Sequence, residues 1–462
     1  MRQEPLEFDL NLIRRLDRSG PRYTSYPTAD RFSESFRDTD YAAAARRRNT
    51  GGVRRPLSLY VHLPFCATLC HYCACNKIAT RDRAKGRQYL GYLEREIGMQ
   101  VKLLAGDLRV TQMHWGGGTP TFHNDAELAR LNVTLRGAFD FAPDGDYSIE
   151  IDPRTVDAQR MAALRTMGFN RVSLGVQDFD PDVQKAVHRL QDEEQTLAVI
   201  AAARANRFAS VNVDLIYGLP RQNLITFNRT LARVISAAPD RIAIYNYAHL
   251  PQRFAPQRRI KEAELPAPEI KLKLLDLAVR RLTAAGYVYI GMDHFALPGD
   301  TLARAQSAGR LTRNFQGYST HADCDLVGLG VSAIGQMGPA YSQNHRALMP
   351  YFDCIDQGRL PVARGIQLSA DDLVRRSVIQ RLTCDFALNK DTLEMAYAID
   401  FDAYFADELQ ELKALAQAGL LMLDGRWISV TPRGRMLVRN VCMVFDRYLR
   451  HAHTLERFSR VI

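Results

Sequence analysis

The sequence lacks any uninterrupted apolar run that approaches the ~20 residues a membrane helix needs. It also lacks a secretory apolar segment after Met1–Pro5. We therefore expect no membrane partner and a cytoplasmic location, where thiols stay reduced.

The positive charge is not gathered into one basic stripe. Lys and Arg number 61 against 51 Asp and Glu, a net charge of +10, but the basic residues are spread along the chain. A nucleic acid, an anionic small molecule and a merely solvated arginine-rich surface are all compatible with this charge. Phosphate backbones favour clustered basic surfaces, so nucleic acid is the weakest of the three interpretations and we expect no such partner.

The chain also lacks a second pair of closely spaced cysteines that would complete a zinc site. Four of its eight cysteines are isolated, whereas the other four fall within ten residues in the pattern C-x3-C-x2-C-x-C: Cys66, Cys70, Cys73 and Cys75. Neighbouring loop cysteines would make strained disulfides. Thiolates on one short loop favour an iron–sulfur cluster, with zinc as the competing interpretation.

A repeating order of short apolar strands and helices begins at Leu57. The expected strands are Leu57–Leu63, Val110–Trp115, Tyr147–Ile151, Arg171–Val176, Val211–Ile216 and Arg241–Asn246. The expected helices between them are Lys85–Leu104, Asp125–Phe139, Asp157–Met167, Glu193–Asn206 and Ile225–Ile235. This order predicts six right-handed βαβ units and a parallel sheet. An eight-unit barrel remains possible if Val288–Gly291 and Leu326–Ile334 add strands.

Glycine or polar residues lie at the ends of the expected strands. They are Gly116–Pro120, Glu150, Gln177–Asp178, Asp214 and Tyr245–Pro251. The backbone can satisfy any one of these groups alone, but a carboxylate in an apolar strand costs free energy without a partner. Ligands of α/β barrels gather at the carboxyl ends of the strands. We therefore predict one shared polar cavity at this edge.

Two regions lie outside the repeating order of strands and helices. Gly20–Thr28, held extended by two prolines, is interpreted as an arm that either packs on the body or helps to close an active site. Residues 290–345 are punctuated by glycine and are interpreted as ligand-lining loops or a barrel-closing connection. The sequence predicts three parts: an N-terminal arm (1–56), a catalytic domain (57–350) and a mostly helical domain (351–462).

The last part combines helices with a small hairpin. Expected helices are Asp371–Leu382, Phe405–Ala418 and Leu437–Tyr448. A hairpin with a two-residue turn at Asp424-Gly425 is expected between Leu420–Leu423 and Trp427–Val430. A winged-helix module has this order, but the basic residues are few, and a packing or lid role is favoured.

The spacing C-x3-C-x2-C resembles that of radical S-adenosylmethionine enzymes. Over nearly the whole length, the chain resembles the oxygen-independent coproporphyrinogen III oxidases. The matching segments are Gly20–Thr28, Tyr60–Lys77, His114–Thr121, Ser148–Arg154, Gly175–Phe179, Asn212–Pro220, Tyr245–Pro251, Gly291–Ala296, Arg313–Tyr318 and Phe458–Ile462. One departure is Ala74, where the family commonly has glycine.

The resemblance implies an α/β fold, a partial (β/α)6 barrel with an N-terminal arm and a smaller, mostly helical C-terminal domain. It implies an oxidoreductase of haem synthesis that converts two propionates of coproporphyrinogen III to vinyl groups. A deoxyadenosyl radical would start this reaction. An electron donor and an electron acceptor, both unidentified, would be its partners. The protein is expected to be a monomer. The alternative is a haem-binding or haem-trafficking protein on the same barrel. Such proteins generally lack the fourth cysteine and the Arg22–Pro27 segment, which are present here.

The resemblance also implies a set of site residues. A [4Fe–4S] cluster would be held by Cys66, Cys70 and Cys73. One S-adenosylmethionine would contact Tyr60, Gly117, Glu150 and Ile334. A second would contact Tyr72, Gly118, Thr119, Gln177, Arg189, Asp214 and Ala248. Cys75, His62 and Gln316 are the candidates for catalytic roles, with structural or hydrogen-bonding roles as their alternatives.

Overall fold

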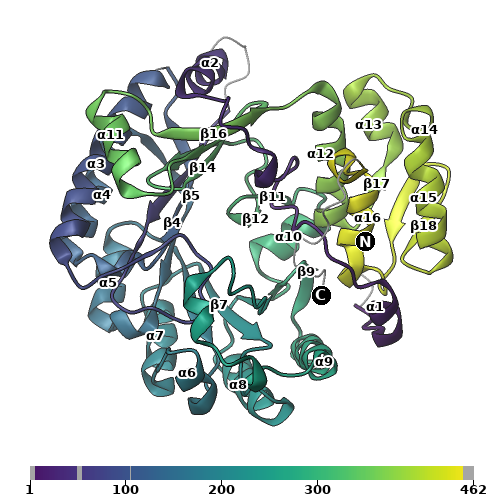
Figure 1. Cartoon of the computed structure of the whole chain (residues 1–462), viewed down its shortest axis with the longest axis horizontal. Coiled ribbons are helices and arrows are strands. Elements are labelled where there is room, and N and C mark those ends of the chain that lie inside the picture. The colour runs from purple at the N-terminus through teal and green to yellow at the C-terminus, as the bar shows by residue number, and fades with distance from the viewer. Residues whose placement is uncertain (1–5, 49–54, 105, 451–462) are drawn as a thin grey trace. The chain divides into compact units, whose positions relative to one another are not determined.

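A computed structural model describes residues 6–48, 55–104 and 106–450 (Figure 1). The matching segment Phe458–Ile462 lies outside these residues. The chain forms two compact units. We call Phe32–Pro266 with Asp323–Gln367 the barrel unit, and Met1–Arg31 with Ala267–Ala322 and Leu368–Ile462 the terminal unit.

The barrel unit is built on a mainly parallel sheet. Its strands are β1 (Leu57–Leu63), β4 (Arg109–Gly117), β5 (Asp140–Ile151), β6 (Arg171–Gln177), β7 (Ser210–Tyr217), β8 (Arg241–Asn246), β13 (Asp325–Leu329), β14 (Ile334–Met337), β15 (Ala340–Asn344) and β16 (Val362–Gln367). They lie in the order β16-β15-β14-β13-β1-β4-β5-β6-β7-β8. Neighbours from β13 to β8 are parallel, and those from β13 to β16 are antiparallel.

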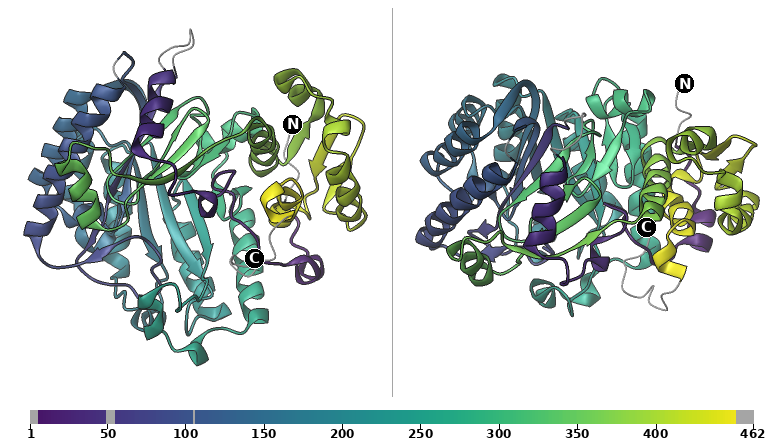
Figure 2. Two further views of the ribbon diagram at one scale, coloured as in Figure 1. Left: turned by 45° about the horizontal axis from the view of Figure 1, so that its top comes forward. Right: turned by 90° about the horizontal axis from the view of Figure 1, so that it is seen from above.

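Helices join the parallel strands and cover the outer face of the sheet, as Figure 2 shows. They are α3 (Arg83–Leu103), α4 (Asp125–Ala138), α5 (Ala158–Thr166), α6 (Pro181–Ala186), α7 (Glu193–Ala205) and α8 (Leu224–Ser236). The unit also contains α2 (Asp38–Arg48), α11 (Leu348–Asp356) and the short parallel pair β2 (Phe65–Cys66) and β3 (Ile78–Ala79). The predicted (β/α)6 barrel is confirmed. An eight-unit barrel does not form, because β13 lies parallel to β1 but continues into antiparallel strands.

Side chains alternate between the two faces of each parallel strand. Leu59, Val61, Met113, Trp115, Ile149, Leu174, Val213 and Leu215 are buried. The residues between them are polar, among them Tyr60, His114, Glu150, Ser173 and Asp214. Since successive residues of a strand point to opposite faces, the polar residues share the face opposite the apolar ones.

The terminal unit combines both ends of the chain with residues 267–322. Its helices are α1 (Leu10–Leu16), α9 (Pro268–Ala284), α10 (Thr301–Ser307), α12 (Ala370–Asp385), α13 (Lys390–Tyr397), α14 (Phe401–Tyr404), α15 (Ala406–Gln417), α16 (Val438–Val444) and α17 (Arg447–Arg450). Its strands form the hairpins β9 (Val288–Gly291) with β10 (His294–Ala296) and β11 (Thr312–Asn314) with β12 (Gly317–Ser319). A small sheet contains β17 (Ala387–Asn389), β18 (Leu421–Leu423) and β19 (Trp427–Val430).

Several local predictions are wrong. The turn between β18 and β19 has three residues, because Asp424 Oδ1 accepts hydrogen bonds from the amides of both Arg426 and Trp427 (2.9 and 2.6 Å). The last helix is broken between α16 and α17, where Asp446 Oδ1 accepts from the amide of Tyr448 (3.0 Å). Residues 290–345 contain strands β9 to β15 rather than loops alone.

Candidate active site

The cysteine loop follows β1 directly. Cys70 is buried, Cys66 and Cys73 are half-buried, and Cys75 is exposed. Cys66 Sγ lies 3.5 Å from Thr119 Oγ1, which comes from the loop after β4. Burial, together with the neighbouring thiols of Cys73 and Cys70, raises the pKa of Cys66 to about 11, although the hydrogen bond with Thr119 opposes the rise. The three sulfurs therefore lie close enough to influence one another.

The donor set fits an iron–sulfur cluster. Cys70 Sγ lies 3.6 Å from Arg189 Nη1, so a cation lies beside one of the three sulfurs. Cysteine thiolates are the usual ligands of iron–sulfur clusters. Among the residues that the structure describes, no three His, Cys, Asp or Glu side chains are placed to hold a single metal ion. A cluster makes a different demand, because each cysteine binds its own iron.

Cys75 is linked to the loop by a hydrogen bond from its thiol to the sulfur of Cys73. This bond lowers the pKa of Cys73 to about 6 and raises that of Cys75. Lys77 Nζ donates to the carbonyls of Cys73 and Cys75 (3.1 and 3.5 Å). Cys75 thus contacts a predicted iron ligand, and its catalytic role stays a prediction.

The glycine run after β4 is packed too closely for larger residues. The amide of Gly118 donates to the carbonyl of Leu63 (2.9 Å), and a Cβ at Gly118 would lie 2.5 Å from the carbonyl oxygen of Pro64. Gly117 has φ +118°, and a Cβ there would lie 2.7 Å from the ring of His62. The run therefore positions the backbone beside the start of the cysteine loop.

We expect Gly117→Ala to destabilise the protein by about 1–3 kcal/mol, because its positive φ and the ring of His62 both oppose a side chain. Thermal unfolding would measure the loss of stability, and S-adenosylmethionine binding would show whether the glycine run still holds this ligand. Gly137→Ala in α4 is the control, since a Cβ there meets no atom within 4 Å. Equal melting temperatures for the two variants would contradict the expectation.

His62 is buried, and both its ring nitrogens have partners. Nδ1 shares a hydrogen bond with the hydroxyl of Tyr60 (3.0 Å), and Nε2 shares one with the carbonyl of Asn76 (2.9 Å). Burial lowers the pKa of His62. The ring therefore connects β1 with the end of the cysteine loop, and its direct part in catalysis stays a prediction.

A row of polar side chains crosses the sheet from β1 to β7. The ring of Tyr60 stacks on that of His114 (5.9 Å between centroids). His114 Nε2 lies 3.1 Å from Glu150 Oε1, and the amide of Gly117 donates to Glu150 Oε2 (3.2 Å). Burial acts to raise the pKa of Glu150, but the hydrogen bond and charge of His114 and the amide of Gly117 lower it below its usual value. Glu150 is thus ionised.

Asp214 continues this row on β7. Its carboxylate accepts hydrogen bonds from Ser173 Oγ (3.1 Å) and Asn212 Nδ2 (2.9 Å). Burial, together with repulsion from Glu150, raises the pKa of Asp214 to about 7. Two carboxylates on one face therefore differ in charge state near neutral pH.

We expect the stability of the ligand-free protein to depend on the titration of Asp214. Its folded pKa lies above the unfolded value, so its full stability contribution is present below about pH 4 and is lost as the pH rises to about 7. Asp214→Asn should therefore gain a few kcal/mol over the wild type between pH 4 and 8, at ~1.4 kcal/mol per pKa unit. Denaturant unfolding at several pH values measures this difference. The exposed Asp182→Asn is the control, and a pH-independent difference for Asp214→Asn would refute the assignment.

Arg189 lies outside the helices of the barrel unit. It follows α6 in a turn, because His188 adopts the left-handed conformation (φ +53°) and ends the helix. Arg189 Nη1 donates to Asp152 Oδ2 (3.1 Å), and Nη2 donates to the carbonyl of Gly175 (2.5 Å). Its Nε is buried and has no hydrogen-bond partner among the described residues. A buried donor of this kind leaves room for an acceptor from a ligand.

The other predicted contact residues are spread around the same edge. Gln177 ends β6 with φ +67°. Tyr72 packs against an apolar cluster that includes Val183, Ile216 and Tyr247. Ala248 follows β8 and is half-buried. Ile334 begins β14, where it pairs with Gln343.

Gln316 belongs to the terminal unit, between β11 and β12. Its amide nitrogen donates to Asn314 Oδ1 (2.9 Å), and its side-chain Nε2 is buried without a hydrogen-bond partner in the described part of the chain. Its predicted catalytic role is not tested by these contacts.

Sequence reasoning missed the residues that support the predicted ones. His114, Ser148, Ser173 and Asn212 lie on the polar face of the sheet, and Asp152 pairs with both Arg154 and Arg189 (2.6 and 3.1 Å). The alternation of apolar and polar residues along each strand could have identified the strand residues of this set, because it marks the polar face of the sheet.

Comparisons with known proteins agree with this geometry. The Radical SAM superfamily model matches residues 60–234, and the HemN C-terminal domain model matches residues 368–437. The oxygen-independent coproporphyrinogen III oxidase of Pseudomonas aeruginosa is 52% identical over 99% of this chain and 100% of its own length. That of Escherichia coli K12 is 49% identical over 100% of both chains.

A solved structure shares the fold over nearly the whole chain. Coproporphyrinogen III oxidase (HemN) from Escherichia coli, described as a radical SAM enzyme, gives a TM-score of 0.92 at 48% identity, covering 96% of this chain and 100% of that chain. The protein is therefore a member of the radical SAM superfamily. Within it, the chain belongs to the family of oxygen-independent coproporphyrinogen III oxidases. No helix among the described residues is long and apolar enough to cross a membrane.

Proposed function

We propose that the protein oxidises coproporphyrinogen III without oxygen, converting the propionates of rings A and B to vinyl groups with loss of carbon dioxide. The product, protoporphyrinogen IX, belongs to haem synthesis. The observation that carries this proposal is identity of about half the residues to oxidases of this name over the full length. The cytoplasmic location and monomeric state expected from the sequence remain part of the proposal.

Cys66, Cys70 and Cys73 would hold a [4Fe–4S] cluster. With S-adenosylmethionine, the cluster would supply the electron and the radical that removes hydrogen from a propionate. Thr119 contacts Cys66, and Arg189 contacts Cys70, so both would help to fix the loop. The glycine run offers backbone groups close to this loop for the amino acid part of S-adenosylmethionine.

Two S-adenosylmethionine molecules would share the polar face of the sheet. Tyr60, Gly117, Glu150 and Ile334 would contact one, as predicted from the sequence. Arg189 and Asp214 would contact the other, since an arginine donor suits a carboxylate and a carboxylate suits ribose hydroxyls. Tyr72, Gly118, Thr119, Gln177 and Ala248 complete this second set.

An anaerobic assay tests the proposal. Protein reconstituted with iron and sulfide is given S-adenosylmethionine, a reductant and coproporphyrinogen III. We expect loss of two carboxyl groups from each porphyrinogen. The alternative, a haem-binding protein, would instead give haem absorption spectra and no decarboxylation.

A further inference from the structure

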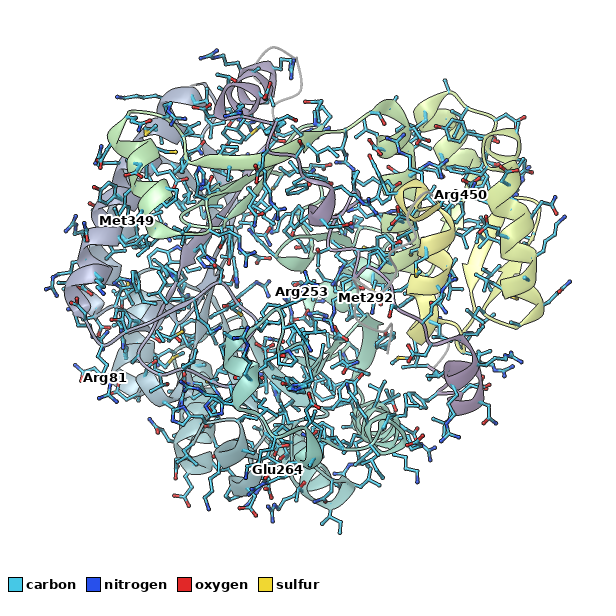
Figure 3. All side chains as sticks on the ribbon, viewed as in Figure 1. Arg81, Arg253, Glu264, Met292, Met349 and Arg450 are labelled. Atoms are coloured by element: carbon cyan, nitrogen blue, oxygen red, sulfur yellow. The ribbon has the colours of Figure 1, made fainter. Side chains whose placement is uncertain are left out.

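Three segments outside the repeating strand–helix units are linked in the terminal unit. They are the arm Gly20–Tyr26, the β9–β10 turn Met292–Asp293 and the β11–β12 hairpin. Met292 of the turn is labelled in Figure 3. Arg22 Nη1 donates to Asp293 Oδ2 (3.1 Å), which ties the arm to the turn. The side chain of Arg439 in α16 donates to the carbonyls of Gly20 and Pro21.

Arg313 and Tyr318 of the β11–β12 hairpin lie near the β9–β10 turn. Its guanidinium lies 4.6 Å from the centre of the Tyr318 ring, and the hydroxyl of Tyr318 donates to the carbonyl of Thr383 (3.0 Å). The ring of Tyr318 also packs edge-on against that of His294 (5.4 Å), the neighbour of Asp293. Arg22 pairs with Asp293, and Arg439 lies close enough to Arg22, Arg313 and Asp293 to interact with their charges. We call Arg22, Arg313 and Arg439 the arginine cluster.

Positive charge exceeds negative charge in the arginine cluster. Asp293, whose carboxylate pairs with Arg22 at 3.1 Å, is the one carboxylate among the charges that act on Arg439, against the two guanidinium groups of Arg22 and Arg313. Burial, together with repulsion from Arg22 and Arg313, lowers the pKa of Arg439 to about 10, although Asp293 opposes the change. The nearby carboxylate of Asp446 accepts a hydrogen bond from Tyr23 (3.0 Å). An additional anion would therefore be stabilised here.

The β11–β12 hairpin, which carries Arg313 of the cluster, also contains buried donors without acceptors. Arg313 Nε and Nη1 are buried and have no hydrogen-bond partner among the described residues, and the same holds for Gln316 Nε2. Buried donors are normally paired, since leaving one unpaired costs its full desolvation. Three such donors on one short hairpin indicate a site whose acceptor is a ligand.

We propose that Arg22, Arg313 and Gln316, supported by Arg439, bind a carboxylate of the substrate. The planar guanidinium group matches a carboxylate in geometry and charge. The proposal rests on the proposed function for the identity of the ligand: coproporphyrinogen III carries four propionates, and one of them would occupy the arginine cluster. Arg22 also gives the N-terminal arm a direct part in substrate binding.

Equilibrium binding of coproporphyrin III, the stable oxidised form with the same four propionates, tests this assignment without turnover. We expect Arg313→Met to raise the Kd by about tenfold or more, because a hydrogen bond to a charged group is lost. Arg22→Met should raise it in the same direction, and serves if Arg313→Met fails to fold. Arg280→Met on α9 is the control, since this exposed arginine pairs with Asp276 in its own helix (2.8 Å) and should keep the wild-type Kd.

Wild-type Kd values in both Arg313→Met and Arg22→Met would overturn the inference, as would a wild-type protein that does not bind coproporphyrin III. The decarboxylation assay separates this failure from that of the proposed function. If wild type and Arg313→Met decarboxylate coproporphyrinogen III with equal KM, only the carboxylate site is wrong. If the wild type neither binds nor decarboxylates, the proposed function is wrong as well.

Discussion

Serine at Cys66, Cys70 or Cys73 is expected to abolish both cluster assembly and decarboxylation. Each substitution replaces a thiolate with a hydroxyl, which stays protonated and binds iron poorly. Cys70 has the additional role of contacting Arg189 at 3.6 Å. Iron and sulfide content after anaerobic reconstitution measures the effect directly, and activity should fall below detection.

Two further variants make this experiment specific. Cys324→Ser is the matched control, because Cys324 lies in the same unit, contacts Thr111 Oγ1 at 3.2 Å and has no predicted iron. It should assemble a full cluster. Cys75→Ser should also keep its cluster, since three cysteines suffice in the proposed arrangement. A full cluster in any single variant of Cys66, Cys70 or Cys73 would show that the ligand assignment is wrong.

Replacement of Arg189 by methionine is expected to remove one of two bound S-adenosylmethionine molecules. The buried Nε of Arg189 has no partner among the described residues and is available to a carboxylate acceptor. Asp152 would keep its ion pair with Arg154 (2.6 Å). The loss in the free energy of unfolding should therefore lie at the low end of the ~3–5 kcal/mol typical of a broken buried ion pair. The measurement is the number of S-adenosylmethionine molecules bound per cluster, which should fall from two to one.

Arg171→Met is the control for this loss. Arg171 begins β6, at the opposite end of the strand from Gln177, and pairs with Asp146 at 2.7 Å. The Arg171→Met substitution removes an ion pair from the same unit but leaves the carboxyl ends of the strands intact. Two S-adenosylmethionine molecules should therefore still bind. Equal stoichiometry in the Arg189 and Arg171 variants would refute the role of Arg189.

The sequence predicted the barrel because its strands are short, apolar and separated by amphipathic helices. β1 and β8 have the predicted bounds, Leu57–Leu63 and Arg241–Asn246. β5 begins at Asp140, well before the predicted Tyr147. The prediction began the strand too late because Pro143 and Gly145 resemble a turn. In the structure, a register shift between β4 and β5 accommodates these two residues within the strand. Residues 1–56 show no repeating strand–helix unit in the sequence, and the two α-helices that form there, α1 and α2, bury only a few side chains each.

The site was predicted where residues lie close together in sequence or at strand ends. The cysteine loop, Glu150 and Asp214 belong to this group. The position of Arg189 in a turn depends on the left-handed conformation of His188, which the sequence does not reveal. The arginine cluster depends on contacts between residues far apart in the chain, such as Arg22 with Asp293 and Arg439 with Pro21, so only the folded unit brings it together.

Transfer of deuterium from the substrate tests the central claim most directly. Reconstituted protein would be given S-adenosylmethionine, reductant and coproporphyrinogen III deuterated at the propionate carbons next to the ring. We expect deuterium in the 5′-deoxyadenosine that is formed, together with two carbon dioxide molecules per porphyrinogen. Unlabelled 5′-deoxyadenosine, or 5′-deoxyadenosine without carbon dioxide, would contradict the proposed reaction.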